Sequence, residues 1–374
     1  MKKTKVVIIA YLIYPQNSPR SNRATELAKE FGRQDYDVTL YGVLGNYDYT
    51  DFETKYNVKV KDLGKHLFCK DTSDGINQRA SFISKVVART IGRFIYYPHI
   101  YLSKLVDNAL RHEKDIDLLI SIAYPFPIHW GVAQFKSNYP DKMKHTTWIA
   151  DCGDPFMGNP FSKHPFYFKN IEKWFCEKTD YLTVPIEEAK EAYYPEFRHK
   201  IEVIPQGFNM DEFKAEGLYK RNEVPTFIYA GVFYQNIRDP QAFLDYLVKK
   251  EIDFKFIVYT KSKALIEPYK DLLGNKLEIK DYVPRIQLLE EMSKADFLLN
   301  IENNTNKQSP SKLIDYALTK RPILNINSNE SLNEKLVDDF LSGNYSGSMK
   351  IVNIEQYDIK NILAQFVSLK KEKE

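Results

Sequence analysis

The chain has 374 residues, of which 43% are hydrophobic and 14% aromatic, so it can bury two packed cores and is not typical of disordered proteins. Its net charge of +3 gives no argument for a nucleic-acid partner, and three cysteines without a Cys-x-x-Cys pair favour a reducing, cytoplasmic setting. The first apolar run ends at Ile13 and no later run approaches the roughly 20 residues of a membrane span, so we expect neither a signal peptide nor a transmembrane segment.

Short apolar, β-rich runs alternate with helical patterns along the chain, which is typical of parallel α/β sheets. The runs in the first half are 6–11, 38–41, 118–123, 148–150, 181–185 and 201–205. The runs in the second half are 227–231, 254–259, 277–280, 297–301 and 322–326. The pattern predicts two doubly wound, Rossmann-like α/β domains with a cleft between them, and ligands of such sheets bind beyond the carboxyl ends of the strands.

A helix with one polar arc is expected after the run 297–301. Ser309 is placed to cap this helix and a proline follows it, so free backbone N–H groups at its start would attract an anion. At about 100° per residue, Ser311, Lys312 and Asp315 share one face, and apolar residues cover the remainder. The alternative is that Lys312 and Asp315 form an ordinary i,i+3 pair on a solvated face.

Two other strand ends carry charged side chains. The loop after 227–231 begins at Gly231 and contains Arg238, which makes it a second position where a phosphate can meet a cation. Asp151 and Asp154 follow the run 148–150, where a carboxylate can orient or deprotonate a substrate hydroxyl. The alternative for these two carboxylates is a capped turn without a chemical role.

Asp115 and Asp117 form an Asp-x-Asp pattern of a kind that can hold a metal ion. They precede a predicted strand, whereas sites on open α/β sheets follow strand ends. We therefore expect no metal site.

The segment 75–106 is rich in basic and aromatic residues and contains no Asp or Glu. A basic helix with an apolar back suits an anionic membrane surface. The alternative is a pair of core-packing helices whose outer face is basic.

Several motifs resemble those of GT-B glycosyltransferases. The segment 310–324, Pro-Ser-Lys-Leu-Ile-Asp-Tyr-Ala-Leu-Thr-Lys-Arg-Pro-Ile-Leu, resembles their donor-binding signature, Ser/Thr-Lys-Leu-x-Glu-Tyr followed by Arg-Pro-Ile. Residues 151–156 resemble an Asp-x-x-Asp-Pro-Trp segment of some bacterial members, and 281–284 resemble the segment whose backbone reads the nucleobase. Residues 204–209 resemble the interdomain hinge, where we expect Gly207 to adopt a positive φ. The resemblance covers nearly the whole chain.

The chain departs from the family pattern at three positions. Asp315 replaces the usual Glu, Val232 replaces a basic residue of the diphosphate site, and Lys307 replaces a carboxylate that contacts the donor sugar.

The resemblance implies that a sugar is transferred from a UDP- or GDP-type nucleotide diphosphate sugar to a glycan or lipid-linked acceptor. The implied reaction is a hexosyl transfer with retention, without a metal or other cofactor, in bacterial surface polysaccharide synthesis. Arg238 and Lys312 would stabilise the leaving diphosphate, and Asp151 or Asp154 would act on the acceptor. The remaining donor-side residues would be Gly231, Tyr282, Val283, Ser309, Ser311 and, at the ribose, Asp315.

The same resemblance assigns residues 1–200 to an acceptor-side domain and 201–355 to a donor-binding domain, with a C-terminal helix over 356–371 that returns to the first. The expected location is cytoplasmic, with peripheral attachment to the inner face of the plasma membrane through 75–106. Two other functions share this fold or donor site: a nucleotide-sugar epimerase and a non-catalytic sugar-binding protein.

Overall fold

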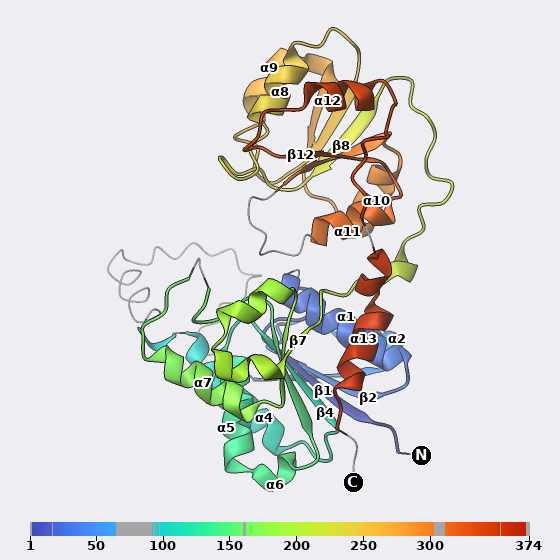
Figure 1. Ribbon diagram of the computed structural model, residues 1–374. Coiled ribbons are helices and arrows are strands. Elements are labelled where there is room, and N and C mark those ends of the chain that lie inside the picture. The colour runs from blue at the N-terminus through green and yellow to red at the C-terminus, as the bar shows by residue number, and fades with distance from the viewer. Residues whose placement is uncertain are drawn as a thin grey trace. The chain divides into compact units, whose positions relative to one another are not determined.

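The computed structural model describes residues 2–16, 18–64, 92, 94–96, 98–159, 162–302, 311–351 and 353–371. The chain forms two compact units (Figure 1): the first contains Met1–Phe208 and Tyr357–Glu374, and the second contains Asn209–Gln356. The structure places the first crossing after Phe208 rather than after residue 200, because β7 (Ile201–Val203) pairs with β6 (Tyr181–Val184) in the sheet of the first unit.

The first unit is built on a seven-stranded sheet in the order β3-β2-β1-β4-β5-β6-β7, and all of its strand pairs are parallel. Its other strands are β1 (Lys5–Ala10), β2 (Asp37–Gly42), β3 (Val58–Asp62), β4 (Leu118–Ala123) and β5 (Thr147–Cys152). The edge strand β3 was not predicted, because its sequence Val-Lys-Val-Lys-Asp alternates apolar and charged residues and presents no apolar run.

Helices cover both faces of this sheet because successive strand residues point to opposite sides. In β1, Val7 and Ile9 pack toward α4, α5 and α7, whereas Val6 and Ile8 pack toward α1 and α13. The helices of the first unit are α1 (Pro19–Arg33), α2 (Thr50–Tyr56), α4 (Leu102–Arg111), α5 (Pro127–Asn138), α6 (Pro140–Met143), α7 (Phe168–Lys178) and α13 (Ile359–Ser368).

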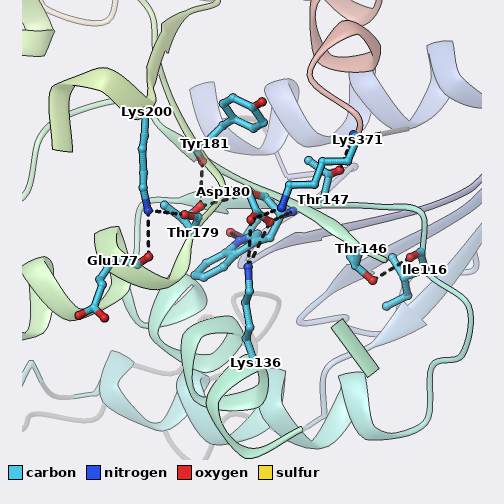
Figure 2. A network of polar contacts seen from close by, with 12 residues as sticks. Ile116, Lys136, Thr146, Thr147, Glu177, Thr179, Asp180, Tyr181, Lys200 and Lys371 are labelled. Atoms are coloured by element: carbon cyan, nitrogen blue, oxygen red, sulfur yellow. Dashed lines mark hydrogen bonds and ion pairs between the residues drawn. The ribbon is translucent and has the colours of Figure 1, made fainter. Parts of the chain in front are cut away.

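The C-terminal segment returns to the first unit through apolar and polar contacts. Phe366 of α13 is fully buried in the core that α1 also covers. Figure 2 shows the polar part of this attachment: Lys371 Nζ lies 2.8 Å from Asp180 Oδ1, and the backbone N–H of Lys371 donates to Thr147 Oγ1. Asp180 Oδ2 accepts from the backbone N–H of Trp148 as well, so this carboxylate joins β5 to the C-terminal segment.

Gly207 serves close packing in the first unit and does not adopt the positive φ that we expected. The glycines with positive φ among the described residues are Gly64, Gly217, Gly231, Gly274 and Gly343. A Cβ atom at Gly207 would lie 2.6 Å from Ile359 Cδ1, so the absence of a side chain lets the connecting segment lie against α13.

The second unit is built on a five-stranded parallel sheet in the order β10-β9-β8-β11-β12. Its strands are β8 (Thr226–Ala230), β9 (Lys255–Tyr259), β10 (Leu277–Lys280), β11 (Phe297–Ile301) and β12 (Ile323–Ile326). Its helices are α8 (Gln241–Val248), α9 (Lys270–Leu273), α10 (Arg285–Ser293), α11 (Ser311–Leu318) and α12 (Glu334–Leu341). The prediction of an α/β protein with two doubly wound sheets is confirmed.

Most of the segment 75–106 lies outside the described residues. Its described end begins α4, where Leu102 and Val106 are fully buried, while Phe94 and Ile95 are more than half exposed. Residues 102–106 therefore belong to a helix that packs on the core, and the predicted membrane surface falls mainly on residues outside those described.

Candidate functional site

A cavity of about 360 Å³ lies at the carboxyl edge of the sheet in the second unit, where the loops after its parallel strands meet. Its lining comes from the ends of β8 and β9, the segment after β10, and the helices α10 and α11. The lining residues are Ala230, Gly231, Val232, Tyr259, Thr260, Lys261, Tyr282, Val283, Leu288, Met292, Lys312, Asp315 and Tyr316. The structure thus brings together five residues that the sequence singled out: Gly231, Tyr282, Val283, Lys312 and Asp315.

Tyr316 fixes α11 to the sheet. Its hydroxyl accepts a hydrogen bond from the backbone N–H of Ala230 at 3.1 Å and donates one to the carbonyl of Leu299 at 3.0 Å. The ring is fully buried, so these bonds tie the helix to β8 and β11 at once. Lys312 and Asp315, which lie on the same helix, are held at the strand ends as a result.

The ammonium group of Lys312 is buried in this cavity. Its Nζ lies 3.8 Å from the ring centroid of Tyr229 and 5.1 Å from that of Tyr316, and it has no hydrogen-bond partner among the described residues. The pKa of Lys312 is lowered well below its ordinary value. Burial is the larger cause, and the positive charge of Arg238 is the smaller one. Aromatic faces offset part of the desolvation of a cation, but they do not replace a hydrogen bond.

Arg238 approaches the same tyrosine from the loop after β8. The backbone of this loop forms a tight turn, and the N–H of Arg238 donates to the carbonyl of Tyr234 at 2.8 Å. Burial raises the pKa of Tyr229 to about 12, although Arg238 acts on its hydroxyl in the opposite direction. The two predicted cations of the donor site, Arg238 and Lys312, therefore meet around Tyr229.

Gly231 allows the backbone to turn at the end of β8. Its φ is +149°, a conformation that favours glycine, and its N–H donates to the carbonyl of Tyr259 at 3.0 Å. A Cβ here would lie 3.3 Å from the hydroxyl oxygen of Tyr229.

Asp315 forms an ion pair with Arg285, a residue that the sequence analysis did not single out. Arg285 is the first residue of α10, and its Nε and Nη2 atoms lie 2.9 Å and 2.7 Å from Asp315 Oδ1. Burial raises the pKa of Asp315, and the charge and hydrogen bond of Arg285 act against that rise. The available sequence signal was a basic residue directly after the segment 281–284.

Tyr282 presents an exposed ring at the wall of the cavity. Its side chain is 53% exposed, and Lys261 Nζ lies 4.7 Å from its ring centroid. An exposed ring beside a cation is a surface on which a planar, electron-rich group can stack.

Asp151 lies in the first unit and is buried among protein donors. Arg23 contacts it through Nη2 at 2.9 Å and Nε at 3.3 Å, and Thr183 Oγ1 donates to it at 2.7 Å. Burial alone would raise the pKa of Asp151, but Arg23 and Arg20 lower it below its ordinary value. A carboxylate with this set of partners is suited to bracing the strand ends, and it is a weak base.

Asp154 follows three residues later and is exposed. Its negative charge acts on Arg20, whose guanidinium lies against Gly153 so closely that a Cβ there would be 2.3 Å from Cζ. Of the two acceptor-side candidates, Asp154 is therefore the one whose carboxylate can reach a ligand.

The sequence matches no protein-family model and no curated protein sequence. Its structure is similar to that of a glycosyltransferase from Rickettsia africae ESF-5, with 12% identity, a TM-score of 0.61 and coverage of 99% of this chain and 95% of the other. It is also similar to Anabaena Alr3699/HepE in complex with UDP and glucose, with 9% identity, a TM-score of 0.58 and 98% coverage of both chains. The chain has the GT-B fold.

The GT-B fold is shared by enzymes with different reactions. A Listeria monocytogenes protein assigned as a UDP-N-acetylglucosamine 2-epimerase has a TM-score of 0.52 at 11% identity, covering 100% of this chain and 99% of the other. The activity of this GT-B chain must therefore be argued from its own residues.

Part of the predicted donor site of this GT-B chain lies outside the described residues. Ser309 and Lys307 belong to that part, and Ser311 is described only as the first residue of α11.

The carboxylates of the Asp-x-Asp pattern engage other groups. Asp115 pairs with Lys2 at 2.8 Å, and Asp117 Oδ2 accepts from the backbone N–H of Lys5. Within the part of the chain that the structure describes, no three His, Cys, Asp or Glu residues gather as metal ligands would, and no helix is long and apolar enough to cross a membrane.

A larger hollow of about 810 Å³ lies at the opposite, amino-terminal edge of the sheet in the first unit. Its lysines include Lys2 and Lys59, which pair with Asp115 and Asp37 at 2.8 Å. Because this hollow lies at the edge where the strands begin, and sites on open α/β sheets lie where strands end, we assign it no ligand.

Proposed function

We propose that the protein is a glycosyltransferase that moves a hexosyl group from a nucleotide diphosphate sugar to a glycan or lipid-linked acceptor, with retention and without a metal ion. The observation that carries this proposal is the buried Lys312 amino group, which has no hydrogen-bond partner among the described residues and whose pKa the charge of Arg238 helps to lower. Two cations close together in a cavity repel each other unless an anion lies between them. A diphosphate supplies that anion.

The rest of the cavity suits the remaining parts of such a donor. Asp315 lines it at one helical turn from Lys312, where its carboxylate can accept hydrogen bonds from ribose hydroxyls. Tyr282 and Val283 line the side on which the base would lie. A volume of about 360 Å³ falls within the ordinary range of small-molecule sites.

The proposed mechanism uses preorganised positive charge. As the glycosidic bond breaks, negative charge grows on the leaving diphosphate and is stabilised by Arg238, Lys312 and the N–H groups in the first turn of α11. On the acceptor side, Asp154 would orient or deprotonate the attacking hydroxyl. Asp151 would hold Arg23 and the adjoining strand ends in place without touching substrate.

The donor class is UDP or GDP type, and the UDP in the similar Anabaena structure makes UDP the first nucleotide to test. A role in surface polysaccharide synthesis, a cytoplasmic location and attachment to an anionic membrane through 75–106 belong to the same proposal. Sedimentation with anionic vesicles at low and high salt tests the attachment, since exposed cations bind such surfaces only weakly when screened.

The deciding experiment measures nucleotide binding by calorimetry for the wild type, Lys312→Ala and Lys335→Ala. Lys335 is an exposed lysine of α12 and serves as a charge-matched control. We expect UDP or GDP to bind the wild type and Lys335→Ala alike and to bind Lys312→Ala much more weakly. Equal binding by all three, or no binding of either nucleotide, would contradict the proposal.

A nucleotide-sugar epimerase is the second candidate, and the similarity to the Listeria protein favours it. Product analysis separates the two reactions, because an epimerase releases an altered sugar without an acceptor, whereas a transferase forms a new glycoside. A non-catalytic sugar-binding protein would do neither.

A further inference from the structure

The contact between Arg285 and Asp315 uses only one oxygen of the carboxylate. Both guanidinium atoms in contact, Nε at 2.9 Å and Nη2 at 2.7 Å, lie near Oδ1. An Arg–carboxylate pair commonly forms a fork in which each oxygen accepts one bond. Here, among the described residues, Oδ2 is the oxygen left for another donor.

The two partners also differ in where they lie. Asp315 lines the cavity at the strand ends, whereas Arg285 does not. The guanidinium thus contacts the carboxylate from a position outside the cavity lining. Arg285 directly follows Pro284 and begins α10, so it also connects Asp315 to the segment that contains Tyr282 and Val283.

We propose that Arg285 is a positioning residue for the donor nucleotide: it holds the Asp315 carboxylate so that Oδ2 accepts hydrogen bonds from the ribose hydroxyls. This inference rests on the proposed function of the cavity. An aspartate carboxylate lies closer to its helix backbone than a glutamate carboxylate would, and it swings about a shorter side chain. A fixed partner behind it therefore decides which oxygen faces the ligand.

A purely structural alternative is that the ion pair only joins α10 to α11. The side chains of Arg285 and Asp315 are 31% and 22% exposed, and partly exposed pairs contribute little to stability. The pair would then contribute little to the free energy of unfolding, and it would not affect the preference of the cavity for ribose over 2′-deoxyribose. The positioning role predicts an effect on ribose recognition in particular.

The charge state of Asp315 gives the proposal a second signature. Burial raises the pKa of this carboxyl, and Arg285 opposes the rise. Removal of Arg285 should therefore raise the pKa of Asp315 further. A protonated carboxyl is a poorer acceptor, so ribose recognition would then weaken as the pH falls. The other titratable groups around the cavity are Tyr259, Lys261, Tyr282, Lys312 and Tyr316.

The test compares each nucleoside diphosphate with its 2′-deoxy form. Calorimetry is performed with UDP, GDP, 2′-deoxy-UDP and 2′-deoxy-GDP on the wild type, Arg285→Gln and Asp315→Asn. Lys294→Ala, at the opposite end of α10, is the matched control, because among the described residues the ion pair of Lys294 is with Glu291 of α10, at 2.7 Å. The readout is the ratio of the deoxy to the ribo dissociation constant for the nucleotide that binds more tightly.

We expect a ratio on the order of tenfold or more in the wild type and in Lys294→Ala, and a ratio near one in Asp315→Asn. In Arg285→Gln the ratio should fall most of the way toward one, and it should fall further as the pH is lowered. If Arg285→Gln does not fold, Arg285→Lys takes its place, because it keeps the charge and donates from one atom only.

Two results would overturn the positioning role: a wild-type ratio near one, or an unchanged ratio in the Arg285 variant. If the Arg285 variant binds the ribo and deoxy forms more weakly by the same factor, the ratio is unchanged, and Arg285 is then a structural brace. Failure of the wild type to bind either nucleotide is a different result, because it removes the proposed function itself.

Discussion

Arg23 and Asp151 form a buried ion pair at the strand ends of the first unit, with Nη2 2.9 Å from Oδ1. Both side chains are about 2% exposed, and the same guanidinium donates to the carbonyls of Ile204 and Pro205. The pair therefore connects α1 and β5 with the segment that leads out of the first unit. The position of Asp151 near the end of β5 suggested a chemical role, whereas the burial of the pair indicates a structural brace.

Asp151→Asn should destabilise the protein, because it leaves the Arg23 charge buried and unpaired. We expect a loss of about 3–5 kcal/mol in the free energy of unfolding, measured by urea denaturation. Asp154→Asn, at an exposed position, should stay within about 0.5 kcal/mol of the wild type and lose transfer activity. Equal stability of the two variants would show that Asp151 is not a brace.

The Arg23–Asp151 pair also predicts a dependence on acid. The folded-state pKa of Asp151 lies below its ordinary value, so the stabilisation is present at neutral pH and is lost as the pH falls through that lowered pKa. The advantage of the wild type over Asp151→Asn should therefore shrink below about pH 4. A difference in stability that stays constant below about pH 4 would show that the Asp151 carboxylate does not contribute through its charge.

Glu172 of α7 should have the opposite dependence. It is fully buried, burial raises its pKa to about 7, and its Oε1 accepts from the backbone N–H of Met157 at 3.3 Å. Because an unfolded glutamate ionises near pH 4.3, the stability of the wild type falls as the pH rises toward 7. Glu172→Gln should gain about 2 kcal/mol relative to the wild type between about pH 5 and about pH 8, measured by urea denaturation at both pH values.

Tyr316→Phe should loosen the helix that carries Lys312 and Asp315. Removal of the hydroxyl leaves the buried N–H of Ala230 and the carbonyl of Leu299 without this partner, at a loss of about 1–3 kcal/mol. We expect a lower melting temperature and weaker nucleotide binding. Phe297→Leu, which changes the core of the same sheet without a polar group, is the control for stability alone. If Tyr316→Phe is less stable but binds nucleotide as tightly as the wild type, then the Tyr316 hydroxyl stabilises the fold without positioning the binding site.

Lys312→Ala and Arg238→Ala should each fold and lose most turnover. Removal of one preorganised donor from such a site lowers the rate by about 10² to 10³, whereas loss of a surface pair changes stability by under about 0.5 kcal/mol. Turnover in Lys335→Ala should match the wild type. Near wild-type turnover in Lys312→Ala would return this residue to a structural role.

The depressed pKa of Lys312 predicts that diphosphate binding takes up protons. Burial and Arg238 lower this pKa in the free protein, and an anion beside the ammonium raises it again. Affinity should therefore increase as the pH decreases toward neutrality, and the apparent binding enthalpy should depend on the ionisation enthalpy of the buffer. The buffer dependence should disappear in Lys312→Ala.

Apolar periodicity alone determined most of the architecture. Parallel strands buried on both faces, such as 118–123, are uninterrupted apolar runs, and the structure has β4 at those residues. The helical spacing of Lys312 and Asp315 likewise placed both side chains on one face, because that relation is local. Strand β3 was missed since an edge strand with a charged side has no such run.

Only the tertiary structure decided which charged residues meet. Arg23 and Asp151 are 128 residues apart and Arg285 and Asp315 are 30 apart, and no local period links such positions. The same holds for burial: Asp151 lies near the end of β5 and Asp154 two residues past its end, yet Asp151 is enclosed by α1 and β6 and Asp154 faces solvent. The pKa of a side chain depends on these enclosing groups, so chemical roles at the strand ends follow from packing, whereas the strand ends themselves follow from the sequence.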